Sequence, residues 1–173
     1  NPLFIEAHQK MHYYDPPPHI ASNNDKHIQR TYFIEIQIFS VDVKNNQLSS
    51  GWKRKTSYLV NNVKKDSYPT ACMIGKGSDG KPLCLEMHTN GSNSLCYNIL
   101  RVENVSSSTQ QASLKRVKGG TFTINDIGPD LALCWLGKNF CYEMYQSSSK
   151  PTRLYYSILK VEKEKDSLPT LSQ

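Results

Sequence analysis

The fold of this 173-residue chain is decided by the stretch TYFIEIQIFSVDV, residues 31–43. Tyr32, Ile34, Ile36 and Ile38 recur at every second position. The residues between them form a mixed face: Phe33, Glu35, Gln37 and Phe39. A period of two is typical of a β-strand that turns one face toward a core. The stretch therefore predicts a strand over residues 31–43 with its isoleucines buried.

Short runs of the same β type fill most of the remaining chain. No window combines apolar residues at helical spacing with helix caps. Further strands are expected at residues 57–60, 71–74, 83–87, 95–102, 112–117, 121–124, 131–136, 140–145 and 154–161. Turn residues separate these runs, and residues 131–145 read as a hairpin. About ten short strands with little helix predict an all-β, antiparallel β-sandwich of the Ig/Rel-like (p53-like) class.

The length of the chain suits one domain. We expect a single β-sandwich over residues 1–165 and a flexible tail over residues 166–173, directly after the mixed charges of residues 162–166. The absence of an initiating Met and of a signal-peptide pattern fits a domain of a larger protein or a mature form. No run of about 18 apolar residues occurs, so no membrane span is expected.

Basic residues outnumber acidic ones, 21 to 15, which gives a formal net charge of +6. This excess favours polyanionic partners, although an ordinary basic surface has the same composition. The sequence carries two basic clusters, Lys53-Arg54-Lys55 and Lys115-Arg116-Val117-Lys118. We expect both clusters at strand ends or in loops, where they would contact phosphates. The alternative is solubilising charge that protects exposed sheet edges.

The segment HYYDPPP, residues 12–18, combines paired aromatic residues with three prolines. Consecutive prolines cannot continue a helix or donate to a sheet, and they hold the chain extended. Lys10, His12 and Tyr13 are therefore candidate binding residues on a stiff support. Tyr13 and Tyr14 could stack on bases or pack under a sheet.

Catalytic and metal-binding signatures are absent from the sequence. The five cysteines contain no CxxC pair, and four of the five histidines lie in the first 27 residues without carboxylate ligands beside them. We expect no metal, no cofactor and no enzymatic activity, since no acid–base pair is recognisable and no local sequence supports a Cys–His nucleophile. Most cysteines stand beside apolar residues, which predicts buried free thiols. A secreted domain with two disulfides and glycans at Asn90 and Asn104 is the alternative.

Three segments occur in an order that resembles a known family. They are HYYDPPP (12–18), SGWKRK (50–55) and CMIGKGSD (72–79). Together they resemble the amino-terminal Rel-like domain of the CSL DNA-binding proteins, the Notch-pathway transcription factors, and residues 159–161 resemble its last strand. The fungal velvet domain, also Rel-like, shares the Asp-Pro-Pro-Pro segment. His12 replaces the family's arginine, residues 21–48 look like an insertion, and residues 119–150 fit poorly.

The resemblance implies a double-stranded DNA-binding domain of a nuclear transcription regulator. Lys10, His12 and Tyr13 would enter the major groove, and the two basic clusters would contact phosphates. His12 is a poorer bidentate donor than arginine, which leaves the base preference open. The implied partners are duplex DNA and protein co-regulators, with no membrane.

Two alternatives to DNA binding stay open. One is a cytosolic or viral protein-binding β-sandwich that would use Tyr13, Tyr14 and the exposed side of residues 32–43. The other is a secreted, disulfide-bonded sandwich that binds protein. The expected compartment is therefore the nucleus, with the cytoplasm or the cell exterior as alternatives.

Overall fold

The computed structural model describes residues 3–14, 29–44, 47–63, 65, 67–91, 93–103, 112–162 and 170–172. These residues form eleven strands and no helix, and every strand pair is antiparallel. The prediction of an all-β, antiparallel fold is confirmed. Since the described part of the chain holds no helix, it holds none long and apolar enough to cross a membrane.

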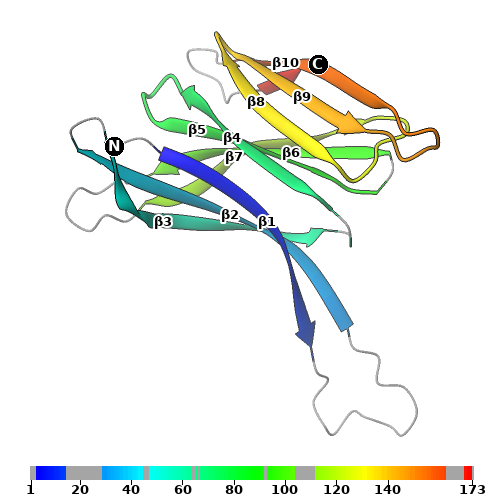
Figure 1. The fold of residues 1–173 in the computed structure, drawn as a ribbon, viewed down its shortest axis with the longest axis horizontal. Helices are drawn as coiled ribbons and strands as arrows, with labels where there is room; N and C mark the ends of the chain where they lie inside the picture. The colour runs from blue at the N-terminus through cyan, green and yellow to red at the C-terminus, as the bar shows by residue number, and fades with distance from the viewer. Residues whose placement is uncertain are drawn as a thin grey trace, which may run out of the picture.

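The strands form three sheets that follow one another along the chain. The first contains β1 (Leu3–Tyr14), β2 (Gln29–Lys44) and β3 (Gln47–Val63). The central sheet contains β4 (Pro69–Lys76), β5 (Pro82–Thr89), β6 (Ser94–Glu103) and β7 (Ser113–Thr123). The third contains β8 (Leu131–Gly137), β9 (Phe140–Gln146), β10 (Leu154–Glu162) and β11 (Thr170–Ser172). In Figure 1 the central sheet lies between the other two, and the hairpin of β1 and β2 extends away from them.

The stretch at residues 31–43 forms most of β2, as its pattern predicts. Ile34, Ile36 and Ile38 are fully buried, and they pack with Cys84 and Leu100 of the central sheet. Burying one such side chain contributes about 1.5–3 kcal/mol relative to leaving it exposed. The isoleucine face of β2 therefore joins the first sheet to the central one.

The opposite face of the central sheet builds the larger core. Leu85, Met87 and Ile99 are fully buried there, against Leu159 and Val161 of β10. Because side chains alternate along a strand, β5 and β6 supply both cores at once. The central sheet is thus covered on both faces, which explains why nearly every residue of β5 is buried.

Strand β7 corrects one prediction. The pattern places a break at Gly119-Gly120 between strands 112–117 and 121–124, but β7 runs through both glycines. A Cβ on Gly120 would lie 2.7 Å from Cε1 of Tyr97, its neighbour on β6. Glycine here permits close packing of a side chain on the backbone and does not mark a turn.

The sequence prediction missed one strand and shortened another. β1 was not predicted, yet it pairs with β2 along its whole length, and β3 begins at Gln47, where only residues 57–60 are predicted. Within the segment expected as a tail, residues 170–172 form β11 and pair with β10. The predicted hairpin over residues 131–145 is confirmed as β8 and β9. Its turn uses Lys138 and Asn139 at positive φ, 46° and 69°.

Candidate functional site

The third sheet carries apolar side chains on the face that no other sheet covers. Inward residues such as Leu133 and Trp135 pack on the larger core. The outward residues alternate with them. We call the following set the outer face: Ala132, Cys134, Leu136, Phe140, Tyr142, Met144, Leu154, Tyr156 and Ile158.

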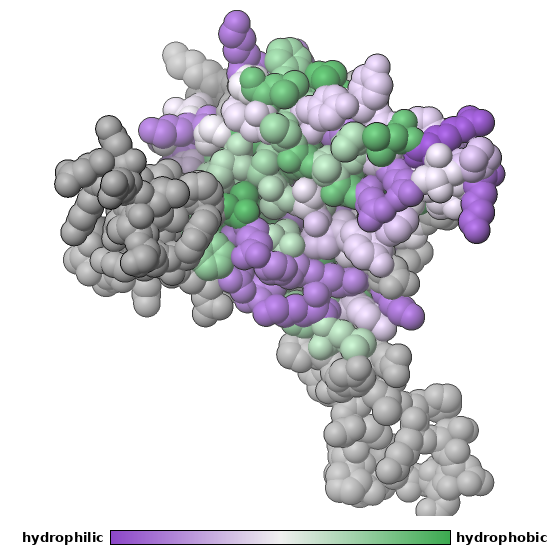
Figure 2. All heavy atoms as spheres, viewed as in Figure 1, coloured by the Kyte–Doolittle hydropathy of each residue, from purple (hydrophilic) through white to green (hydrophobic). Residues whose placement is uncertain are grey.

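Residues of the outer face are strongly exposed and contiguous. Tyr156 is 70% exposed, Leu154 66% and Leu136 57%. Tyr156 pairs with Met144 across β10 and β9, and its ring stacks on that of Tyr142 at a centroid distance of 5.9 Å. Figure 2 shows hydrophobic side chains gathered in the upper part of the molecule, where Figure 1 places β8 to β10. Contiguous apolar surface of this kind is typical of an interaction site.

Charges at the margin of the outer face are mostly basic. Lys138 lies in the β8–β9 turn, and Lys160 follows the last outward residue of β10. Lys160 is ion-paired with Glu162 at 3.0 Å, while Lys138 is exposed. Arg153, just before β10, is exposed as well. A partner with an acidic rim would complement this margin.

Both predicted basic clusters lie inside strands, contrary to the expectation of strand ends or loops. Residues 53–55 belong to β3, and Lys115, Arg116 and Lys118 belong to β7. β3 and β7 contact each other, so the two clusters belong to contacting strands. Lys115, Arg116 and Lys118 are all exposed, and Arg116 also lines a pocket. Within the predicted cluster on β7, Arg116 is the residue that borders this pocket.

The candidate recognition residues lie in the β1–β2 pair. Lys10 is ion-paired with Glu35 of β2, while His12 and Tyr13 lie near the end of β1, opposite Thr31 and Arg30. Lys53 lies toward the other end of this sheet, because it pairs with Ser40, which also pairs with Leu3. At about 3.3 Å per residue this separation approaches 30 Å. The structure does not gather His12 and Lys53 into one site.

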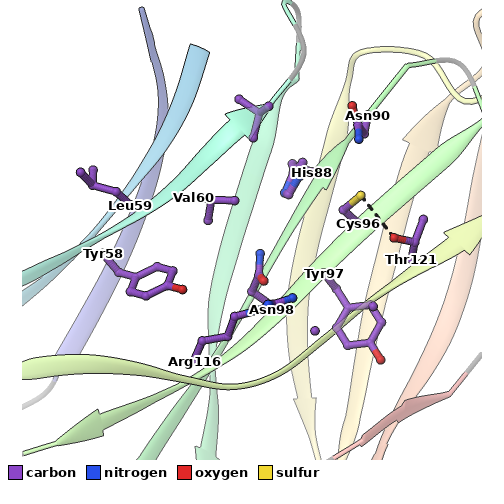
Figure 3. A pocket seen from close by; sticks show the side chains of 13 residues that line it. Tyr58, Leu59, Val60, His88, Asn90, Cys96, Tyr97, Asn98, Arg116 and Thr121 are labelled. Carbon is purple, nitrogen blue, oxygen red and sulfur yellow. Dashed lines mark hydrogen bonds between the residues drawn. The ribbon is translucent and has the colours of Figure 1, made fainter. Parts of the chain in front are cut away.

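A pocket of about 450 Å³ lies between β3 and the central sheet. Figure 3 shows Tyr58, Leu59 and Val60 of β3 on one side and the side chains of β5, β6 and β7 on the other. The polar lining comprises His88, Asn90, Cys96, Asn98, Arg116 and Thr121. The apolar wall and the polar wall therefore come from different sheets.

Cys96 belongs to a hydrogen-bonded chain that extends behind the pocket wall. Nδ1 of His88 lies 2.7 Å from Oε1 of Glu86. Nδ2 of Asn98 donates to Oε2 of the same carboxylate at 2.7 Å. Cys96 lies directly opposite His88 in the register of β5 and β6, and its Sγ lies 3.6 Å from Oγ1 of Thr121. Glu86 is fully buried, so it orients His88 from below the surface.

The electrostatics of this chain favour a thiolate beside an imidazolium. Burial lowers the pKa of His88, but hydrogen bonds to Cys96 and Glu86 outweigh it and raise the pKa to about 9. The hydrogen bond from His88 lowers the pKa of the Cys96 thiol, against the opposing effect of burial. By contrast, burial raises the pKa of Cys84. Cys96 is thus the thiol with the chemical setting of a nucleophile.

Arg116 reaches the pocket because Gly119 leaves room for it. A Cβ on Gly119 would lie 1.9 Å from Nη2 of Arg116. The guanidinium thus folds back over its own strand, and it forms no ion pair with any residue that the structure describes. Oδ1 of Asn90, which lines the same pocket, is buried without a hydrogen-bond partner among the residues that the structure describes. The pocket therefore offers a cation and an unpaired acceptor to a ligand.

All five cysteines are free. Cys84 and Cys141 are buried, as predicted, but Cys134 is exposed on the outer face because it points outward from β8. Cys72 hydrogen-bonds to Cys141. Among the described residues no group of His, Cys, Asp and Glu could hold a metal ion.

Sequence reasoning missed the chain of Glu86, His88 and Cys96. The signal was nevertheless present in two predicted strands, 83–87 and 95–102, joined by a predicted turn. In that hairpin His88 pairs with Cys96 and Glu86 pairs with Asn98. Directly opposite residues lie about 4.5–5.5 Å apart at Cβ, close enough to interact. Writing out the cross-strand register would have identified the pair.

No family model, no curated protein and no solved structure matches the chain. Functional inference therefore rests on the sequence and the structure.

Proposed function

We propose that this chain is a protein-binding β-domain that docks its partner on the outer face of β8, β9 and β10. The observation that carries the proposal is the exposure of Leu136, Tyr156 and Ile158 on one continuous sheet face. Aromatic residues at the centre of such a face supply large contact area at low conformational cost. The domain would thus be an interaction module, which is one of the alternatives that the sequence left open. That alternative placed the interface on Tyr13, Tyr14 and residues 32–43, whereas this proposal places it on the outer face.

The expected partner is a protein surface with an apolar centre and an acidic rim. The outward ladder of Tyr142, Met144 and Tyr156 would meet the apolar centre. Lys138 and Arg153 at the margin would meet the acidic rim. A second copy of this chain fits less well, because its margin repeats the same positive charge and the whole chain carries +6.

Selection from a random peptide display library on the immobilised domain tests this proposal. We expect the recovered peptides to combine aromatic or aliphatic residues with Asp and Glu. The double variant Tyr156→Lys/Ile158→Lys should lose these peptides, with a weakening of at least about tenfold, since it places charges at the centre of the docking face.

The matched control is Met11→Lys, which puts a charge on an exposed apolar residue of β1 and should bind the peptides like wild type. Peptides that bind both variants equally would contradict the proposal. A dimer of wild type in analytical sedimentation that the double variant abolishes would also contradict the proposal, because a second copy of the chain would then occupy the outer face.

Duplex-DNA binding is the second candidate function, and the contact between β3 and β7 favours it. That contact joins the two strands that carry the clusters, which the sequence separates by about sixty residues. Lys115 and Lys118 are exposed on β7 and suit phosphate contacts. If this candidate function holds, the packed sheets form a Rel-like sandwich and the protein acts in the nucleus. The motifs at residues 12–18, 50–55 and 72–79 support it.

Titration of a labelled duplex pool at two salt concentrations tests the second candidate. We expect binding at low salt whose logarithmic salt slope flattens by about 0.9 for each phosphate contact removed. The triple variant Lys53→Glu, Lys115→Glu, Lys118→Glu should therefore bind much more weakly and with a flatter slope. The control triple Lys76→Glu, Lys138→Glu, Lys150→Glu makes the same charge change elsewhere. Equal losses in both triples, or no binding at low salt, would contradict the candidate.

A further inference from the structure

We propose that Cys96 is a thiol–disulfide exchange site that accepts small amino-acid or peptide disulfides bearing a carboxylate. The site combines the Cys96 nucleophile, the His88 base, the Glu86 carboxylate that orients the base, and Arg116 as the anion contact. The inference does not depend on the outer-face proposal, because the pocket lies between β3 and the central sheet, away from the outer face.

The geometry follows the arrangement that activates a nucleophile. Glu86 binds Nδ1 of His88, which leaves Nε2 for the Cys96 thiol, because Cys96 lies directly opposite His88 in the register of β5 and β6. The Glu86 carboxylate thus orients His88, and Asn98 in turn holds the Glu86 carboxylate. A nucleophile, a base and an orienting carboxylate in hydrogen-bond contact form the usual constellation for nucleophilic side chains. Figure 3 shows His88 and Cys96 on adjacent strands at the pocket wall.

The exchange step requires no group that the pocket lacks. Cys96 transfers its proton to His88, and the thiolate attacks one sulfur of the disulfide. A new S–S bond to Cys96 forms as the disulfide bond of the ligand breaks. The departing thiolate takes the proton from the His88 imidazolium and leaves as a neutral thiol. The product is a mixed disulfide on Cys96 and a neutral His88.

The ligand class follows from the rest of the lining. Arg116 has no carboxylate partner among the described residues, so it can bind one from the ligand. No described residue donates to the buried Oδ1 of Asn90, and an ammonium or amide N–H of the ligand would satisfy it. The volume of about 450 Å³ falls in the range of small-molecule sites. A carboxylate with a neighbouring N–H is the common feature of amino-acid and peptide disulfides.

The test compares a charged and a neutral disulfide by mass spectrometry of the intact domain. The probes are oxidised glutathione and bis(2-hydroxyethyl) disulfide, used on a Cys134→Ser background that removes the exposed thiol. We expect Cys96 to be the residue modified first at pH 7. Arg116→Gln should slow the reaction with oxidised glutathione about tenfold and change the neutral reaction less than about twofold. The control Lys115→Gln removes the neighbouring charge, which does not line the pocket, and should change neither rate.

Two further variants keep the test decisive if one of them folds poorly. Gly119→Ala should displace the Arg116 guanidinium and reproduce the selective loss of Arg116→Gln. His88→Gln should slow both probes about tenfold at pH 7 and move the rate profile to higher pH, because the thiolate fraction falls. Equal slowing of both probes by Arg116→Gln, or modification of Cys72 or Cys84 before Cys96, would overturn the proposal.

Discussion

Replacing Glu143 by Met is expected to stabilise the domain by roughly 3 kcal/mol at pH 8. Glu143 is fully buried and points inward from β9 between Cys141 and Tyr145. Neither carboxylate oxygen has a hydrogen-bond partner in the described part of the chain. Burial raises the pKa of this carboxyl from its ordinary value of 4.5 to about 7. Above pH 7 the folded protein therefore carries an unpaired buried charge, and an apolar side chain of similar size removes that cost.

The pH dependence of this effect has a definite sign. Because the folded state binds the Glu143 proton more tightly than the unfolded state, this carboxyl stabilises the fold below pH 4.5, and that stability is lost as the pH rises through 7. Urea denaturation of wild type and Glu143→Met from pH 4 to pH 8 measures it. The difference in free energy of unfolding between the two proteins should grow with pH over this window. His88 titrates in both proteins, so its contribution cancels in this difference.

Glu143→Gln serves as the control, since it removes the charge but keeps a polar group in the core. Its stability relative to wild type should grow with pH in the same way, but the gain should be smaller than that of Glu143→Met, because a buried amide without partners still costs free energy. If the free energy of unfolding of Glu143→Met differed from that of wild type by a constant amount from pH 4 to pH 8, Glu143 would be solvated in the folded protein.

Gly128→Ala is expected to cost about 2 to 3 kcal/mol of stability. Its backbone N–H donates to O of Gln146 at 2.6 Å, and a Cβ at this position would lie 2.8 Å from both that oxygen and O of Ser147. Both contacts are to backbone atoms, so no side chain can rotate away. The neighbouring segment is also held in place, because Oγ of Ser148 and N of Ser149 donate to Asp126.

Thermal denaturation checks this prediction against Gly80→Ala. Gly80 adopts a φ of +75°, and nothing lies within 4 Å of a Cβ there. That substitution should cost only the strain of a left-handed residue, about 1 kcal/mol. If Gly128→Ala were no more destabilising than Gly80→Ala, the loop before β8 would not pack on the end of β9 as described.

The strand content could be predicted from alternation wherever β-branched and aromatic residues mark it. β2 follows its isoleucines closely, and β8 and β9 follow the alternation around a two-residue turn. β1 also alternates, with Ile5 and Ala7 facing inward and Glu6 and His8 exposed. Alanine, histidine and glutamate have weak β propensity, so the pattern was not recognised. The number of sheets depends on long-range packing that local periodicity does not contain.

The candidate sites were less predictable than the fold. Alternation in 131–136 and 154–161 indicates two faces, but both faces of these strands are apolar, and only packing decides which one stays exposed. Tyr156 and Ile158 were therefore missed as candidate binding residues. His88 and Cys96 were missed because the chemistry depends on cross-strand register, which the sequence contains only after the hairpin is drawn. Arg116 was predicted as a phosphate contact, and only the packing on Gly119 reveals its place in a pocket.

Mapping amide chemical shifts while a display-selected peptide is titrated into the isotope-labelled domain tests most directly whether the outer face binds protein. We expect the largest shift changes at Leu136, Phe140, Tyr156 and Ile158, with small changes elsewhere, because the peptide would cover β8 to β10. Shift changes centred on β3 and β7, with the outer face unaffected, would contradict the assignment of the outer face as the docking surface.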